Sequence, residues 1–180
     1  GTRYAHRTKT KQDAKLIPFV FETGDAYIIE LTALAARFYQ TGIIVRDSHA
    51  ITVASWAAGV ATITSAGNHG QIGDLIVVAG VTPAGYNGSY IVTAKAGNDL
   101  SYALASDPGA GTVFGTVADP YTITSPYALA DFATLQYDQI GNVIFFAAGQ
   151  ALAARTLTRT AHTTWAFALA TFTWGPLGYV

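Results

Sequence analysis

The first part of the chain alternates apolar and polar residues with a period of two. Residues 16–22 and 26–33 each place every second apolar side chain on one face, which is typical of half-buried β-strands. The three residues between these runs include Gly24, so the pair predicts a β-hairpin. Residues 36–45 predict a second strand pair that turns at Thr41 and Gly42. Pro18 has no backbone N–H to donate, so we expect its strand to be bulged or at a sheet edge.

The middle of the chain, from residue 49 to residue 119, changes character. Short apolar runs rich in Val and Thr alternate with segments rich in Gly, Pro, Asn and Asp. Short strands at roughly ten-residue spacing favour a small β-barrel or sandwich. The strands are predicted at residues 60–64, 75–79, 89–94, 100–105 and 113–117.

After residue 119 the pattern of the first part returns. Residues 129–137 predict one short helix, because Ser125 followed by Pro126 is typical of a helix start. Residues 142–148 predict a strongly buried strand, and residues 154–174 predict two more strands.

These patterns together predict an all-β fold with a discontinuous outer part. The outer part, residues 1–49 and 119–180, is expected to form an antiparallel, propeller-blade-like β platform with one short helix. Residues 50–118 are expected to form a small β-barrel or sandwich inserted into it.

Composition limits the classes of partner that the chain can recognise. Only 12% of residues are charged and the net charge is −1, so no overall field attracts nucleic acid or acidic membranes. No apolar run reaches the ~18 residues of a membrane span, so we expect no membrane insertion. The absence of Cys excludes disulfides and thiolate ligands. Met is also absent, even at position 1, so we expect a processed product or a piece of a longer protein.

Sequence signals for catalysis are weak. Asp47, Ser48 and His49 are consecutive, but neighbouring side chains in an extended strand point apart, so a catalytic triad is not expected. The four histidines lack the short spacings of zinc motifs, and His69 in a turn-rich segment is interpreted as solvated. A Gly-rich run at residues 109–115 lacks the Lys and the helix of a phosphate-binding loop. The sequence therefore predicts no enzyme, no cofactor and no metal site.

Aromatic side chains of the middle module are the candidate ligand contacts. Tyr and Trp on a β surface can stack on sugar rings, and the alternative is that these residues belong to the hydrophobic core. The candidates are Trp56, Tyr86, Tyr90 and Tyr102.

Several sequence blocks outside the middle module form a series. They are GTR at the start, LIPFVFE followed by AYIIE, then RFYQTG, and after the module PY, LQYDQIGNVIFF and RTLTRTAHTTW. This series resembles the N-terminal part of a family of bacteriophage tail proteins that includes nozzle and tail-tube-like proteins of short-tailed phages. Asn142 replaces the usual Asp, and residues 148–154 replace a Pro-rich turn, so the local turn geometry differs. The middle module is similar to a small β module that recurs in phage tail and surface proteins.

The resemblance implies a structural virion protein with no enzymatic site. It would be made in the bacterial host cytoplasm and located in the phage tail, with copies of itself in a ring and other tail proteins as partners. A function of another class is a binding module, in which residues 50–118 recognise a host-surface glycan or another tail protein.

The basic residues near the start are candidates for subunit docking. DNA would pass through such an assembly, and cation–phosphate contacts would slow its passage, so a channel wall is better near-neutral or acidic. We therefore expect no specific nucleic-acid binding from these residues, which are Arg3, Arg7, Lys9, Lys11 and Lys15.

Overall fold

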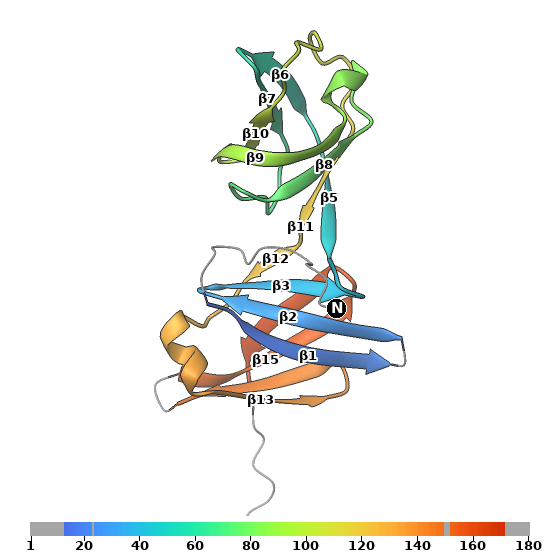
Figure 1. The fold of residues 1–180 in the computed structure, drawn as a ribbon. Coiled ribbons are helices and arrows are strands. Elements are labelled where there is room, and N and C mark those ends of the chain that lie inside the picture. Colours follow the sequence, from blue (N-terminus) through green and yellow to red (C-terminus); the bar gives the residue numbers. More distant parts are fainter. Residues whose placement is uncertain (1–12, 23, 150–151, 172–180) are drawn as a thin grey trace, which may run out of the picture.

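The computed structural model describes residues 13–22, 24–149 and 152–171, most of which lie in antiparallel strands (Figure 1). Its helical segments in these ranges are two short 3-10 turns, η1 (Ala84–Tyr86) and η2 (Leu129–Ala133). The predicted all-β class is therefore confirmed. Among the described residues, no helix is long and apolar enough to cross a lipid bilayer.

Two antiparallel sheets form the outer part, which we call the platform. The first sheet has the order β1–β2–β3–β12, with β4 paired to β3; the strands are β1 (Lys15–Glu22), β2 (Asp25–Thr32), β3 (Ala35–Gln40), β4 (Ile43–Ile44) and β12 (Thr122–Thr124). The second sheet runs in chain order through β13 (Leu135–Ile140), β14 (Val143–Ala148), β15 (Leu152–Ala161) and β16 (Thr164–Leu169). Pro18 lies in β1 at the edge of the first sheet, as predicted.

The two platform sheets bury a common core. Ile17 and Phe19 of the first sheet and Phe146 of the second belong to one buried cluster. The Trp165 ring stacks on the Phe38 ring with centroids 4.5 Å apart, and it meets the Phe19 ring edge-on at 4.7 Å. The blade-like second sheet therefore buries one face against the first sheet of its own chain.

The middle of the chain forms a second unit, residues 46–120, which we call the insert module. Its strands form one curled antiparallel sheet around a separate core that contains Ile63, Ile76 and Leu100. The order is β5–β11–β8–β9–β10–β7–β6, with bounds β5 (Arg46–Ala50), β6 (Val53–Ala57), β7 (Val60–Thr64), β8 (Leu75–Ala79), β9 (Gly88–Ala96), β10 (Asp99–Ala103) and β11 (Thr116–Pro120).

The module joins the platform at one place. It is inserted between β4 and β12, which both pair with β3. The Tyr121 N–H donates a 2.9 Å hydrogen bond to the Val45 carbonyl, so the chain leaves and returns to the platform at adjacent residues. Figure 1 shows the module standing beyond one side of the platform, connected through β5 and β11.

Two sequence predictions need correction, and one strand was missed. Residues 129–137 are not one helix: η2 ends at Ala133, and Leu135–Ile140 pairs along its whole length with β14. Strand β6 was not predicted, because its Ala and Ser residues have weak strand preference. The buried strand at residues 142–148 is buried on one face only, since Ile144 and Phe146 point into the core while Phe145 is half-buried on the other face.

Candidate functional site

The most polar buried region of the described chain lies where the insert module meets the platform. Arg37 of β3 and Asp74, which precedes β8, are almost completely buried and form an ion pair in which the Arg37 Nη2 donates to both carboxylate oxygens, at 2.7 and 2.9 Å. The Arg37 Nε also donates to the Thr122 hydroxyl at 3.2 Å. Because this pair joins a platform strand to the module, it fixes how the two units sit against each other.

Beside this ion pair lies a second group of titratable side chains, which we call the junction cluster: Asp47, His49, His69 and Asp119. Asp47 and His49 come from β5, Asp119 comes from β11, and His69 comes from the loop that precedes β8. Ligand atoms of Asp47, His49 and His69 all lie within 4.8 Å of one another. The His49 Nε2 is 3.4 Å from Asp119 Oδ1 and 3.8 Å from Asp47 Oδ2.

Strand geometry explains why three members of the junction cluster share one face. Asp47 and His49 are two residues apart on β5, so their side chains point to the same side of the sheet, and Ser48 points to the other. Asp119 is the direct partner of Asp47 across the β5–β11 ladder. This arrangement agrees with the expectation that Asp47, Ser48 and His49 do not form a triad.

Asp119 is the most unusual carboxyl of the cluster. It is fully buried, and its Oδ2 accepts a hydrogen bond from the backbone N–H of His69. Burial raises the pKa of the Asp119 carboxyl to about 6, although His49 and the backbone N–H groups of His69 and Gly70 act to lower it. Ionising the buried Asp119 side chain therefore costs free energy unless a cation lies close to the carboxylate.

A polar cleft of about 340 Å³ opens next to the junction cluster. Its walls include Leu34 and Thr122 of the platform and Asn68, His69 and Lys95 of the module. The Lys95 Nζ donates a 2.6 Å hydrogen bond to the Asn68 side-chain oxygen, which holds the loop against β9. His69, one member of the junction cluster, therefore lies in the wall of this cleft.

The predicted aromatic contacts lie mainly inside the module. Tyr86 and Tyr102 are fully buried, and the Tyr102 hydroxyl donates to the Tyr86 carbonyl at 3.0 Å. The Tyr90 ring stacks on the Tyr102 ring at 4.1 Å, and the Trp56 Nε1 donates to the Leu104 carbonyl at 2.7 Å. These contacts favour the alternative that the four aromatics are core residues.

Of the predicted docking cations, one lies in the described part of the chain. The Lys15 Nζ donates to the Phe132 carbonyl at 3.0 Å and also to the Leu135 carbonyl, so it ties β1 to the start of the second platform sheet. The other four lie outside the described residues: Arg3, Arg7, Lys9 and Lys11.

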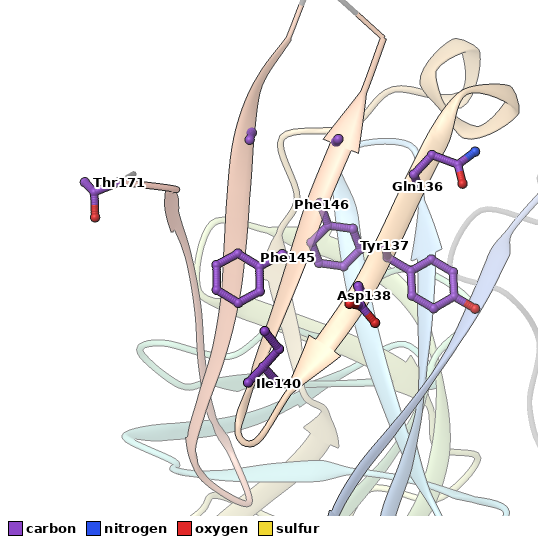
Figure 2. Close-up of a pocket in the computed structure, with 9 residues that line it drawn as sticks. Gln136, Tyr137, Asp138, Ile140, Phe145, Phe146 and Thr171 are labelled. Atoms are coloured by element: carbon purple, nitrogen blue, oxygen red, sulfur yellow. The ribbon is translucent and has the colours of Figure 1, made fainter. Parts of the chain in front are cut away.

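The platform carries a second, apolar hollow on the outer face of the β13–β16 sheet. This hollow has a volume of about 680 Å³ and is lined by Ile140 and Phe145, among others. Figure 2 shows these two side chains on neighbouring strands, with Tyr137 earlier on β13 than Ile140. Ile140 is 67% exposed, so a large apolar side chain here meets water in the isolated chain.

Sequence reasoning did not find the junction cluster. A local signal was present, because a D-x-H pattern on a strand places both side chains on one face. The missing information was non-local: only the fold brings His69 and Asp119 close to His49, from positions 20 and 70 residues further along the chain.

Comparison with protein-family models, with curated proteins and with solved structures finds no match to this chain. The functional assignment therefore rests on the residues and geometry of the chain itself.

Proposed function

We propose that this chain is a structural subunit of a bacteriophage tail, in which the platform packs against neighbouring subunits and the insert module is held away from it. The motif series of the outer segments supports this assignment; apart from GTR, which lies outside the described residues, its blocks lie in or beside the platform strands. The single observation that carries the packing role is the exposed apolar hollow on the β13–β16 sheet. A surface of this kind is typical of subunit interfaces.

The neighbouring subunit is a second copy of this chain. Net charge near zero removes long-range repulsion between copies, and the low charged fraction leaves apolar surface available for contact. Tail components form rings by repeating one heterologous contact, in which the hollow of one copy receives a different surface of the next.

The glycan-binding alternative has less support. Its candidate aromatics are held by stacking and hydrogen bonds within the module, and Tyr86 and Tyr102 have no exposed surface. Aromatic side chains can stack on sugar rings only if their ring faces are exposed.

Self-association tests the packing role. The wild-type chain should form oligomers as its concentration rises, measured as mass by light scattering after size exclusion. Ile140→Ser should weaken the association by about tenfold or more, because one buried interface side chain contributes about 1–3 kcal/mol.

Ile43→Ser is a matched control. Ile43 is the same residue type with the same 67% exposure, but it lies in β4 of the first sheet. A wild-type chain that stays monomeric up to about 100 μM, or equal weakening by both substitutions, would argue against packing through this hollow.

A further inference from the structure

The junction cluster contains buried polar atoms that no hydrogen bond within the described chain satisfies. Asp47 and Asp119 are direct cross-strand partners on β5 and β11, and like charges at such positions are destabilising. Asp119 is fully buried, and its Oδ1 makes no hydrogen bond within the described chain. The His49 Nε2, 3.4 Å away, likewise has no hydrogen-bond partner among the described residues.

Nearby cationic side chains are directed elsewhere. The Arg46 guanidinium donates to the Leu75 carbonyl at 2.6 Å, and the Lys95 Nζ donates to Asn68. Arg37 is committed to Asp74. Two carboxylates and two imidazoles thus converge on a region where a small cation would be strongly stabilised.

Two distances within the junction cluster, both measured from His49, are close to those between ligands of a four-coordinate metal. Zinc bonds to nitrogen and oxygen of about 2.0–2.2 Å place the donor atoms of a tetrahedron about 3.4 Å apart. The His49 Nε2 lies 3.4 Å from Asp119 Oδ1 and 3.8 Å from Asp47 Oδ2. The donor atoms of Asp47, His49 and His69 lie within 4.8 Å of one another, and Asp119 joins these three through its 3.4 Å approach to His49.

We propose that Asp47, His49, His69 and Asp119 bind one divalent transition-metal ion of the zinc class. Two imidazole donors favour Zn²⁺ over Mg²⁺ and Ca²⁺, which prefer a shell of oxygen ligands. The second oxygen of each carboxylate is already oriented, because Asp47 Oδ1 accepts from the Ser48 N–H at 2.8 Å and Asp119 Oδ2 accepts from the His69 N–H. Such supporting bonds aim the remaining oxygen at the metal.

Four protein ligands make this a structural site. A metal with all four positions filled by the protein has none left for substrate, in contrast to a catalytic zinc. The ligands come from β5, β11 and the loop before β8, so the ion would fasten this loop to the two strands that carry the insert module. The inference does not depend on the phage-tail assignment.

Metal titration of the whole chain tests the proposal. After treatment with a chelator and dialysis, the wild-type chain should bind one equivalent of Zn²⁺ with a Kd below about 10 μM in a calorimeter. Its melting temperature should rise with Zn²⁺ and not with the same concentration of Mg²⁺, because binding to the folded state alone stabilises it. Co²⁺ in place of Zn²⁺ should give the intense visible absorption of a tetrahedral site.

Substitutions locate the site. His49→Gln and His69→Gln should each weaken Zn²⁺ binding by at least about tenfold, since even residues that only support a ligand contribute that much. His162→Gln and His6→Gln serve as matched controls and should leave the affinity unchanged; His162 lies in the platform, where its Nδ1 is 2.8 Å from the Tyr27 hydroxyl.

Three results would overturn the inference. The first is a wild-type chain without saturable one-equivalent binding, which would mean that a protonated His49 alone balances Asp119. The second is wild-type Co²⁺ absorption of the weak octahedral kind, a measurement that needs no variant to fold. The third is affinity that survives both junction substitutions or falls with a control.

Discussion

At the scale of single residues, the Arg37–Asp74 pair is the main electrostatic link between the two units. Both side chains are nearly fully buried, so neither charge can be hydrated if the other is lost. A buried pair of this kind adds little net stability compared with apolar residues, but an unpaired member is strongly destabilising. The pair therefore favours one orientation of the insert module relative to the platform.

Asp74→Asn should lower the free energy of unfolding by about 3–5 kcal/mol, because it leaves the Arg37 charge buried without its partner. Denaturant titration followed by circular dichroism measures this loss. Asp138→Asn, at an exposed carboxyl of β13, is the control and should change stability by less than about 0.5 kcal/mol. A loss below about 1 kcal/mol for Asp74→Asn would show that the junction is hydrated in solution.

At the scale of elements, strand β14 points its apolar side chains alternately to the two faces of the sheet. One set packs in the core, and the other set lies on the outer face. Ile144 and Phe146 are buried in the platform core, whereas Phe145 is half-buried on the outer face of the sheet, where it lines the hollow together with the edge of Phe146. The run VIFFAA looks buried throughout when read as a sequence, but a sheet with only one packed face can bury only every second residue.

The two adjacent phenylalanines of β14 make a controlled comparison. Phe146→Ala should reduce the free energy of unfolding by about 3–5 kcal/mol, because it opens a cavity beside the Tyr127 and Phe167 rings. Phe145→Ala should reduce it by only about 1 kcal/mol, since that side chain keeps water contact in the monomer. Urea titration of both variants measures the difference, and a reversed order would mean that the strand register is wrong.

Local patterns were sufficient to predict many elements. The hairpin of β1 and β2 and the bounds of β7 and β8 follow from alternation and Gly-containing turns, which act over a few residues. The 3-10 turn η2 was overestimated as a helix because pairing with β14 claims the residues from Leu135 onward. Such pairing is tertiary, and it overrides local helix preference.

The module boundaries and the junction cluster could not be predicted from local patterns either, because both depend on contacts between distant parts of the chain. Strands β5 and β11 belong to the module sheet because they pair with each other and β11 pairs with β8, so the module starts at Arg46 and ends at Pro120. Likewise, the approach of His69 to His49 depends on how the loop before β8 folds over β5.

At the scale of the whole molecule, the topology keeps the insert module apart from the platform. The platform sheet is continuous through β3 whether or not the module is present, because β4 and β12 both pair with β3 and Val45 is bonded to Tyr121. The insert module has its own core and touches the platform through a compact polar junction. Under the proposed tail assignment, copies would pack through platform surfaces while each one carries its module outward.

The most direct test of the tail assignment is to locate the protein in purified phage particles that carry its gene. Antibodies raised against the whole chain, coupled to gold and viewed by electron microscopy, should label one defined position on the tail and leave the capsid unlabelled. Particles from a phage that lacks the gene serve as the control. The account is contradicted if the protein is present in the infected-cell lysate while intact particles contain none and carry no gold on their tails.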